Sequence, residues 1–235
     1  AVFQNIYTLQ QDRPKYTLIL SGDHIYQMNY NEMLRHHIDN RADITIGVVP
    51  MPVDTASEFG IVVANQNMSV TGFQEKPKSN PRTMPDDPGK VLVSMGIYAF
   101  NTDVLIKQLI EDAKQKDSSH DFGKDIIPKM VQNGDTVIAY PFTGVAGHSY
   151  WRDIGTLDAY YEAHMDLVSV TPKCNLYDPH WPIHTVYSTV PPAKMVFSGG
   201  EDGKRIGTLL DSIICNGTII SGGRVTRSII SPNVR

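Results

Sequence analysis

The chain has 235 residues, of which 41% are hydrophobic and 20% are charged, and its formal net charge is −4 at pH 7. This composition is typical of a globular protein and excludes a disordered chain, which would be poor in aliphatic residues. The acidic balance argues against a nucleic-acid or anionic-membrane partner, because such surfaces select clustered lysine and arginine. The two cysteines, Cys174 and Cys215, have no metal-ligand spacing, so we expect a reducing, cytoplasmic location.

The longest apolar run and the first residues give two further expectations. No segment approaches the roughly 20 apolar residues that span a bilayer, since the run Ile44–Val53 is broken by Pro50 and Pro52. A membrane partner is therefore not expected. The opening "AVFQNIYTLQQDR" has neither an initiator methionine nor a basic start. It is typical of the interior of a longer protein, so we expect a fragment.

The first 165 or so residues alternate strand-like and helix-like patterns, which indicates an α/β arrangement. Tyr16–Leu20 is an apolar run consistent with a fully buried parallel strand. Asn29 or Asn31 can cap a helix that runs towards Asn40 and carries Met33, Leu34, His37 and Ile38 on one face. Asp43–Val49 is predicted to be a second, β-branched strand.

The middle of the chain predicts a hairpin, a loop and a further strand. Ile61–Ala64 and Ser69–Glu75 are the hairpin strands, joined through asparagine-rich residues that tolerate left-handed backbone. The proline-rich stretch Lys78–Lys90 has no periodicity and is predicted to be an exposed loop. Ser94–Phe100 is predicted to be a strand.

Helices and strands alternate again towards residue 168. A helix over Asp103–Ala113, capped by Asn101 or Thr102, is followed by a short helix that ends at Gly134 and by a strand in "TVIAYPF". Thr156 then opens an amphipathic helix to about Val168. Apolar or aromatic residues recur along it at helical spacing: Leu157, Tyr160, Tyr161, His164 and Leu167.

The composition changes near Ser169. Five prolines between there and Phe197 are typical of a linker. Beyond it, aliphatic pairs at Ile213-Ile214 and Ile219-Ile220, followed by Val225, indicate a six-residue period that fits the opening coils of a parallel β-helix. The period slips afterwards.

Asp23 follows the first predicted strand in "LSGDHIY". Ligands of open α/β sheets bind beyond the carboxyl ends of strands, which makes Asp23 a candidate ligand residue. An Asx-turn or a cap for the following helix is an equally weighted alternative. His24 is interpreted as a packing residue or as a neighbour of that site.

Two further motifs carry charged residues at the ends of strands. "FQEKP" places Glu75 and Lys76 where the lysine can meet a phosphate, although an ordinary solvated pair is the commoner case for such a dipeptide. "YWRDIGT" places Asp153 before a helix, where the residue can also serve helix entry electrostatically. Asp23 and Asp153 together offer two hard oxygen ligands for Mg²⁺.

Some catalytic signatures are missing from the sequence. "SSHDFGKDIIP" carries His120, Asp121 and Lys124 around a capping pattern, but no nucleophilic serine or cysteine in an elbow context completes a hydrolytic triad. Neither G-x-x-x-x-G-K-[ST] nor G-x-G-x-x-G follows a strand. A phosphate loop of these types is therefore absent from the sequence given.

Eight motifs follow one another in a definite order across essentially the whole chain. They are "LSGDHIY", "ASEFGIV", "FQEKP", "SMGIYAF", "SSHDFGKDIIP", "YWRDIGT", "LYDPHWPIHT" and "PPAKMV". Together they resemble the bacterial ADP-glucose pyrophosphorylase (glucose-1-phosphate adenylyltransferase) family. "EKP" recurs in other sugar-nucleotide pyrophosphorylases, whereas "SSHDFGKDIIP" and "YWRDIGT" are much more specific to this one.

The resemblance implies the architecture of the chain. Residues 1–168 would form part of a nucleotidyltransferase α/β domain with a Rossmann-like, mixed and mostly parallel sheet. A linker over 169–205 would lead to the start of a left-handed parallel β-helix over 206–235.

The resemblance also implies residue roles. Asp23 would be the catalytic, metal-associated carboxylate, and Asp153 would be the second ligand of Mg²⁺. Lys76 would be catalytic and, with Glu75, would bind glucose 1-phosphate. The sugar site would further be lined by Gly60 and Ser94.

The implied reaction joins ATP and glucose 1-phosphate to give ADP-glucose and pyrophosphate for glycogen synthesis, in a homotetramer. The family's glycine-rich ATP loop would precede residue 1, so the fragment alone is expected to be inactive. Two alternatives stay open: a non-catalytic regulatory paralogue, and a pyrophosphorylase for another nucleotide sugar. The presence of Asp23, Lys76 and Asp153 favours an enzyme over the paralogue.

Overall fold

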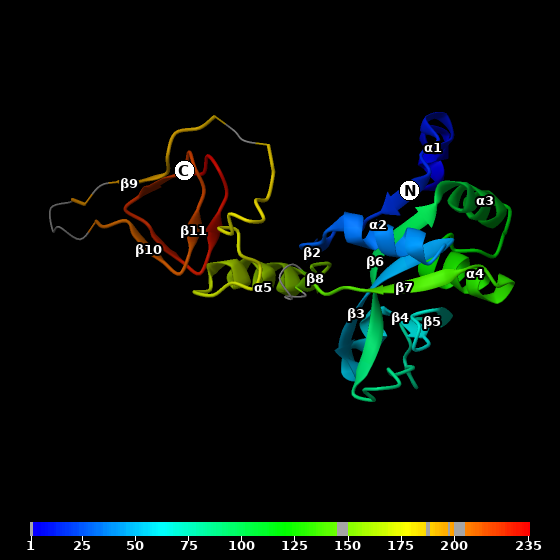
Figure 1. Ribbon diagram of the computed structural model, residues 1–235. Helices are drawn as coiled ribbons and strands as arrows, with labels where there is room; N and C mark the ends of the chain where they lie inside the picture. Colours follow the sequence, from blue (N-terminus) through cyan, green and yellow to red (C-terminus); the bar gives the residue numbers. More distant parts are fainter. Residues whose placement is uncertain (1, 145–149, 187–188, 197, 200–204) are drawn as a thin grey trace. The chain divides into compact units, whose positions relative to one another are not determined.

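The structure is a computed structural model, drawn as a ribbon in Figure 1. It describes residues 2–144, 150–186, 189–196, 198–199 and 205–235. The chain divides into two units, and the second unit is assembled from two separate segments, Asp23–Tyr26 and Arg152–Arg235. The first unit comprises Ala1–Gly22 and Gln27–Trp151.

Six strands form the sheet of the first unit, in the order β5-β4-β6-β3-β7 with β1 added on β6. Their bounds are β1 (Tyr16–Ile19), β3 (Ile44–Pro52), β4 (Gly60–Ala64), β5 (Val70–Glu75), β6 (Lys90–Asn101) and β7 (Val137–Pro141). Each strand predicted in this part of the chain is present. Pro50 and Pro52 lie beyond Val48, where the pairing of β3 with β7 ends, and both still lie opposite residues of β6.

The sheet is mixed, as predicted. β1, β3 and β4 pair antiparallel with β6, β5 pairs antiparallel with β4, and β7 pairs parallel with β3. Four strands, β1, β3, β4 and β7, therefore run in one direction and β5 and β6 run in the other. The prediction that Tyr16–Leu20 is a fully buried parallel strand is wrong, because β1 pairs with the antiparallel β6 and its residues are only half-buried.

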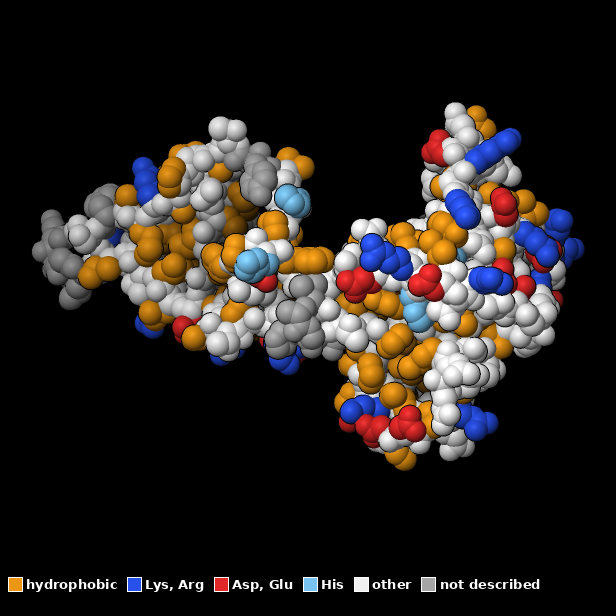
Figure 2. All heavy atoms as spheres, viewed as in Figure 1, with side chains coloured by type: hydrophobic (Ala, Val, Ile, Leu, Met, Phe, Trp, Pro, Cys, Tyr) orange, Lys and Arg blue, Asp and Glu red, His pale blue; other side chains and the backbone are white. Residues whose placement is uncertain are grey.

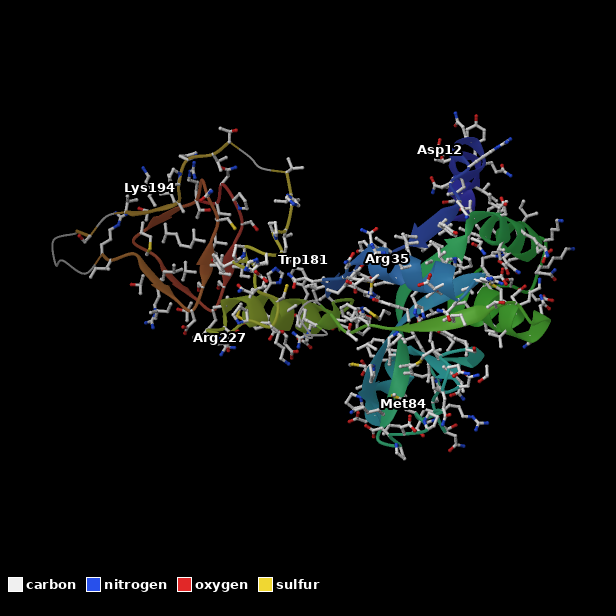
Figure 3. All side chains as sticks on the ribbon, in the orientation of Figure 1. Asp12, Arg35, Met84, Trp181, Lys194 and Arg227 are labelled. Atoms are coloured by element: carbon white, nitrogen blue, oxygen red, sulfur yellow. The ribbon has the colours of Figure 1, made fainter. Side chains whose placement is uncertain are left out.

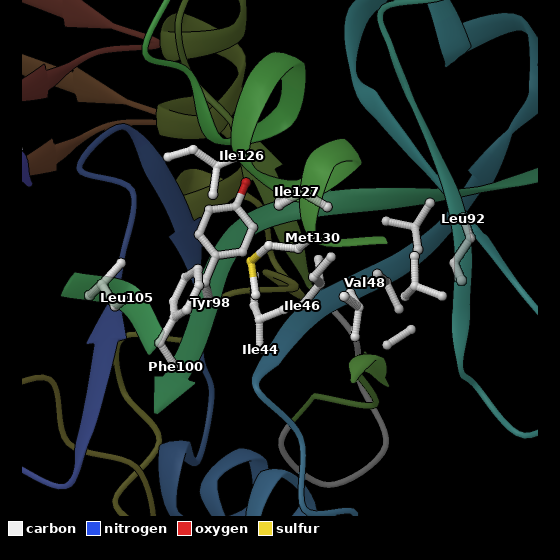
Figure 4. Close-up of a cluster of buried hydrophobic side chains, with 14 of the residues drawn as sticks. Ile44, Ile46, Val48, Leu92, Tyr98, Phe100, Leu105, Ile126, Ile127 and Met130 are labelled. Carbon is white, nitrogen blue, oxygen red and sulfur yellow. The ribbon is translucent and has the colours of Figure 1, made fainter. Parts of the chain in front are cut away.

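The hydrophobic core lies around the centre of this sheet. Ile44, Ile46 and Val48 alternate along β3 and share a buried cluster with Tyr98 and Phe100 of β6 (Figure 4). The first six residues of β3 are all buried, which means that both faces of this strand are covered. A continuous apolar run, rather than an alternating one, was therefore the correct signal for a central strand.

Seven helical segments accompany the sheet. They are η1 (Phe3–Asn5), α1 (Ile6–Asp12), α2 (Tyr30–Asp39), η2 (Val53–Glu58), α3 (Thr102–Asp112), η3 (Phe122–Ile126) and α4 (Ile127–Asn133). α2 is capped by Asn29, whose side-chain oxygen accepts from the backbone N–H of Asn31 at 3.2 Å. α4 ends at Gly134 with φ of +80°, a left-handed conformation that glycine adopts without strain. Both ends match the sequence prediction, whereas α1 had no predicted counterpart.

The buried face of α2 is narrower than predicted. Met33 and His37 are buried, but Ile38 is 45% exposed. His37 shares a 2.8 Å hydrogen bond between its Nδ1 and the Thr45 hydroxyl of β3. Burial lowers the pKa of His37, so the imidazole is held as a neutral hydrogen-bonding group at the base of the helix.

The predicted hairpin and the loop that follows it are present. In the turn between β4 and β5, Asn65 Oδ1 accepts from the backbone N–H groups of Asn67 and Ser69, each at 3.0 Å. The loop between β5 and β6 is exposed over most of its length, but Met84 (Figure 3) is half-buried against the core. On the visible face of the first unit, basic and acidic side chains are intermixed (Figure 2).

The second unit holds the strand β2 (His24–Tyr26), the last two residues of β8 (Trp151–Asp153) and the helix α5 (Leu157–Val168). The predicted cap of α5 is confirmed, since the Thr156 hydroxyl accepts from the Ala159 N–H at 3.2 Å. The apolar side of the helix is nevertheless open to solvent. Leu157, Tyr160 and Tyr161 are 88%, 52% and 48% exposed, and Ala163 is the buried residue of α5.

The end of the chain forms short parallel strands. They are β9 (Lys194–Val196), β10 (Thr208–Leu210), β11 (Ile213–Ile214), β12 (Ile219–Ser221), β13 (Arg224–Thr226) and β14 (Ile229–Ile230). β10 pairs in parallel with β13, β11 with β14, and β9 with β12. Partners in the first two pairs are 16 positions apart, which explains why the six-residue period slips.

In the range 169–205, predicted as a linker, the described residues before β9 form no helix or strand. β9 lies inside this range, and it pairs in parallel with β12 near the end of the chain. Residues 187–188, 197 and 200–204 of the range lie outside the described residues. Within the described ranges, no helix combines the length and the apolar character needed to cross a membrane.

Candidate functional site

Asp23 and Asp153 are placed at the ends of the two paired strands of the second unit. β2 starts directly after Asp23, and β8 ends at Asp153. The two strands form a two-stranded sheet, and the Ile154 N–H donates to the backbone oxygen of Asp23 at 3.1 Å. Backbone pairing therefore brings together two carboxylates that are 130 positions apart in the sequence.

His24 completes a cluster with these two residues, which we name the Asp23 cluster (Asp23, His24 and Asp153). One ligand atom from each lies within 4.8 Å of the other two. His24 Nε2 is 3.6 Å from Asp23 Oδ1 and 3.9 Å from Asp153 Oδ2. Among the residues that the structure describes, this is the one group of three acidic, histidine or cysteine side chains with metal-binding spacing.

The donor set of the Asp23 cluster fits a divalent cation. Two carboxylate oxygens suit a hard ion such as Mg²⁺, and an imidazole nitrogen is also accepted by Mn²⁺ or Zn²⁺. The side chains of Asp23 and Asp153 are 63% and 37% exposed, whereas that of His24 is 12% exposed. Exposed carboxylates leave room for water and phosphate oxygens, which complete the coordination of Mg²⁺ in enzymes that act on nucleotides.

The sequence also allowed structural roles for the two aspartates, a helix cap for Asp23 and helix entry for Asp153, and the structure supports only the second. Asp23 does not cap a following helix, because the chain continues directly into β2. Asp153 does serve the turn before α5, since its Oδ1 accepts from the Gly155 N–H at 2.7 Å. Its other oxygen, Oδ2, is the one that faces His24. The turn and the ligand role of Asp153 are therefore compatible.

Arg152 anchors this segment to the helix that follows it. Its guanidinium lies 3.0 Å from Asp166 Oδ2 and 3.5 Å from Glu162 Oε2, both on α5. The arginine of "YWRDIGT" therefore joins β8 to α5, and the neighbouring Asp153 is left to face His24.

In the first unit, Glu75 is the last residue of β5, and Lys76 follows it with φ of +45°. A lysine in left-handed backbone costs about 1–2 kcal/mol. The Lys76 N–H donates to the Phe59 oxygen at 3.1 Å, which holds that conformation at the sheet edge. Residues held in strained backbone cluster at active sites and ligand clamps, so Lys76 is a candidate for such a role.

Gly60 lies opposite Glu75 in the register of β4 and β5. A Cβ atom at Gly60 would lie 2.6 Å from Phe73 Cζ and 3.0 Å from Glu75 Oε2. A side chain at this position would therefore displace both the phenylalanine ring and the carboxylate. Gly60 lets the glutamate lie flat against the strand.

The segment around Asp121 approaches the same carboxylate. Asp121 Oδ1 caps η3 by accepting from the N–H groups of Gly123 and Lys124 at 2.8 and 2.9 Å. A Cβ atom at Gly123 would lie only 2.7 Å from Glu75 Oε2. Glu75 is therefore enclosed by two glycines, one from β4 and one from η3.

Charges of both signs surround Glu75. Partial burial raises the pKa of Glu75, and the negative charge of Asp121 raises it further, while Lys76 and Lys124 act in the opposite direction. Two carboxylates and two lysines at one place can hold a ligand that carries both hydroxyls and a phosphate.

Tyr98 connects Ser94 to this group. Burial raises the pKa of Tyr98 to about 12, a hydrogen bond with Ser94 lowers it, and the charges of Asp121 and Glu75 raise it. Figure 4 shows the Tyr98 oxygen at the end of the ring that lies next to Ile126 of η3. We name Glu75, Lys76, Tyr98, Asp121 and Lys124 the Glu75 cluster.

Three members of the Glu75 cluster were not among the predicted site residues. Tyr98 was assigned to a strand, and Asp121 and Lys124 were interpreted only as part of a capping pattern. Forty-six positions separate Glu75 from Asp121, and only the sheet and η3 bring the two together. The clustering of charge in "SSHDFGKD" was the one available signal.

A nucleotidyl transferase family model matches residues 1–170, and a model of a GlmU-like C-terminal hexapeptide region matches residues 191–235. The chain belongs to the nucleotidyl transferase family. The second match agrees with the short parallel strands of the second unit. The predicted family and fold class are confirmed, and the chain carries the start of a β-helix.

The chain is also similar over its whole length to curated bacterial proteins, each named glucose-1-phosphate adenylyltransferase. It is 51% identical to that of Koribacter versatilis, 48% to that of Rhodopirellula baltica and 46% to that of Nitrosomonas europaea. The matches cover 100% of this chain but 56%, 53% and 54% of the relatives. The chain therefore spans about half their length. Nucleotidyl transferases generally use a divalent metal, which agrees with the donor set of the Asp23 cluster.

Proposed function

We propose that the full-length protein is a glucose-1-phosphate adenylyltransferase, which makes ADP-glucose and pyrophosphate from ATP and α-D-glucose 1-phosphate for glycogen synthesis. The observation that carries the proposal is the identity of 43–51% across nearly the whole chain to relatives of that name. The two residue clusters supply the chemistry that such a reaction requires.

The reaction is a nucleotidyl transfer. A phosphate oxygen of glucose 1-phosphate attacks the α-phosphorus of ATP, a new P–O bond forms, and the bond to the β-phosphate breaks to release pyrophosphate. Such a displacement needs positioning and neutralisation of charge rather than a covalent enzyme intermediate. Acid and base residues therefore act here mainly by holding groups in place.

Asp23 and Asp153 would hold Mg²⁺, with His24 beside them. When bound, Mg²⁺ offsets negative charge on the α-phosphate and the leaving group. The carboxylates themselves would fix where that charge is neutralised, because both stand on backbone that is tied together by the β2–β8 pair.

Lys76 and Glu75 would bind glucose 1-phosphate. The lysine would pair with the sugar phosphate, which is also the attacking group, and Glu75 would accept hydrogen bonds from sugar hydroxyls. Gly60 would leave space for the carboxylate, and Ser94 would orient Tyr98 at the same site. Lys76 is thus both a binding and a catalytic residue in this proposal.

Two other functions stay as alternatives. A regulatory paralogue would be expected to have lost the carboxylates or the lysine, but Asp23, Lys76 and Asp153 are all present. A pyrophosphorylase for another nucleotide sugar would use the same chemistry, and only the relatives' names favour ATP and glucose 1-phosphate. We further propose a cytoplasmic homotetramer, as the family resemblance implies.

A panel assay of the full-length protein tests these proposals together. Pyrophosphate release would be measured with ATP, UTP, dTTP and GTP against glucose 1-phosphate and other sugar 1-phosphates, with Mg²⁺ present. The highest kcat/KM is expected for ATP with glucose 1-phosphate. Preference for another pair would select the second alternative, and no release with any pair would select the paralogue. Light scattering of the same sample would give the mass of the assembly.

A further inference from the structure

A buried carboxylate stands at the end of α3, outside both clusters. Asp112 is the last residue of the helix, and only 7% of it is exposed. The C-terminal end of a helix carries partial negative charge, so an aspartate there is electrostatically unfavourable, and burial adds a desolvation cost. Asp112 is therefore placed where it cannot serve the stability of its own helix.

The partners of Asp112 lie on the loop that follows. Its Oδ1 accepts from the Ser118 hydroxyl at 2.7 Å, and its Oδ2 accepts from His120 Nδ1 at 2.7 Å. The Ser118 oxygen in turn accepts from the His120 backbone N–H at 2.9 Å. We name Asp112, Ser118 and His120 the Asp112 cluster. The His120 side chain is 56% exposed, so the contact with Asp112, rather than packing, fixes its place.

These contacts hold a strained backbone immediately before Asp121. His120 has φ of +58°, in the left-handed region that disfavours residues with a side chain. On the other side of the loop, Asp125 Oδ2 accepts from the Ser119 hydroxyl at 3.0 Å and from the Asp121 N–H at 3.1 Å. The loop is therefore fastened at both sides, and its last residue is the one that faces the Glu75 cluster.

The position of Asp121 matters because it determines which groups lie against the Glu75 carboxylate. Asp121 caps η3, and that capped turn carries Gly123 to where its Cβ position lies 2.7 Å from Glu75 Oε2. A small shift of the loop would move Asp121 and the turn relative to Glu75 at the same time. Displacements of this kind affect binding at a site without any contact with the ligand.

We propose that the Asp112 cluster is a positioning device for the sugar-phosphate site, which sets the affinity for glucose 1-phosphate by fixing the loop that carries Asp121 against Glu75. The proposal rests on the proposed function, since it takes the Glu75 cluster as the sugar-phosphate site. Asp112 and His120 act through Asp121 and do not touch the substrate.

Two single variants of the full-length protein and their combination test this. Asp112→Asn removes one charged acceptor, and His120→Gly removes the ring while glycine adopts positive φ without strain. Each is expected to raise the KM for glucose 1-phosphate on the order of tenfold, below the roughly 100-fold that a misplacement of about 1 Å can cost. The KM for ATP should stay unchanged. The double variant should raise the KM no further than one single variant, because the two residues act as one unit.

Two more variants separate positioning from general structure. Asp117→Asn makes the same chemical change at an exposed residue one position before Ser118 and should leave both KM values unchanged. His120→Asn keeps an N–H donor on Cγ, where His120 carries Nδ1, and tolerates positive φ, so it should retain more of the affinity than His120→Gly. Thermal unfolding of each variant reports whether the fold is intact.

Three results would overturn the proposal. They are an unchanged KM for glucose 1-phosphate in folded variants, an equal rise of both KM values with a large fall in Tm, and fully additive effects in the double variant. Failure of the proposed function would show differently, as wild-type protein that makes no ADP-glucose. In that case, calorimetric binding of glucose 1-phosphate, or of the sugar phosphate that wild type does use, would be compared across the same variants.

Discussion

The Glu75 cluster and the Asp23 cluster place carboxylates in opposite surroundings. Glu75 is enclosed by two glycines, and burial raises its pKa, whereas Asp23 is 63% exposed on the end of a three-residue strand. The first cluster is supported by a six-stranded sheet with a large core, and the second by a two-stranded sheet.

The difference fits two kinds of ligand. A sugar has a fixed shape with many hydroxyls, so a site for it gains from enclosed, rigidly held groups. A hydrated cation brings its own water and exchanges ligands, so it needs exposed oxygens on a small frame. We therefore expect changes in the Glu75 cluster to act mainly on the KM for glucose 1-phosphate, and changes in the Asp23 cluster to act mainly on kcat.

The largest effect is expected for Asp23→Asn or Asp153→Asn. Loss of one charged ligand should lower kcat by roughly 10²- to 10³-fold, the range seen when one group that stabilises transition-state charge is removed. The KM for glucose 1-phosphate should change little. Asp158→Asn, an exposed aspartate in the first turn of α5, is the matched control. A kcat near that of wild type would remove the tested residue from the metal site.

The next effect concerns Lys76. Lys76→Ala should raise the KM for glucose 1-phosphate by roughly 10- to 100-fold, because a charge-assisted contact is worth about 1.5–3 kcal/mol. Lys76→Gly should raise the KM equally, yet unfold at a higher temperature than Lys76→Ala, because glycine adopts the φ of +45° without strain. An unchanged KM in both variants would exclude the lysine from the sugar site.

Gly60→Ala tests whether the close approach at Glu75 matters. The new Cβ would lie 2.6 Å from Phe73 Cζ, so we expect a loss of about 1–3 kcal/mol in the free energy of unfolding, typical of overpacking. Glu75 would be displaced too, and the KM for glucose 1-phosphate should rise. Gly72→Ala on β5 is the control, since its Cβ would meet Val63 at an ordinary 3.6 Å. Denaturant unfolding that gives equal stability for both variants would contradict the prediction.

The smallest effect is expected for the stability of Glu75→Gln. A carboxyl whose pKa is raised on folding binds its proton more tightly in the folded state. The protonated group therefore adds to the free energy of unfolding, and this addition is lost as the pH rises through the raised pKa. Glutamine has no such charge. The variant should therefore have the higher Tm, with a gap that widens as the pH rises above 4.5, the ordinary value for glutamate. A wild-type protein that gains stability over the same range would show that the lysines outweigh burial.

Local patterns predicted the helix ends well, because caps and turns depend on residues close in sequence. Asn29, Gly134 and Thr156 each end or begin a helix as expected. The direction of β1 was missed, because the pairing of β1 with β6 depends on the whole sheet. The exposure of Leu157 was missed because periodicity locates an apolar face but not its partner.

The candidate site was predictable where one motif supplied its residues. Glu75 and Lys76 are adjacent, and Asp23 and Asp153 each follow a local signal. Asp121 was missed because its approach to Glu75 arises only through the packing of η3 on the sheet. No spacing rule links these two positions.

The second unit is discontinuous, since it takes four residues from near the start of the chain and the rest from beyond Trp151. This has a consequence for synthesis on the ribosome. A nascent chain that ends before Asp153 contains Asp23 and His24 but lacks the end of the strand that pairs with β2, and so holds two of the three residues of the Asp23 cluster. Any premature stop within the first 150 codons of this stretch would therefore yield a protein that lacks Asp153 and the strand β8.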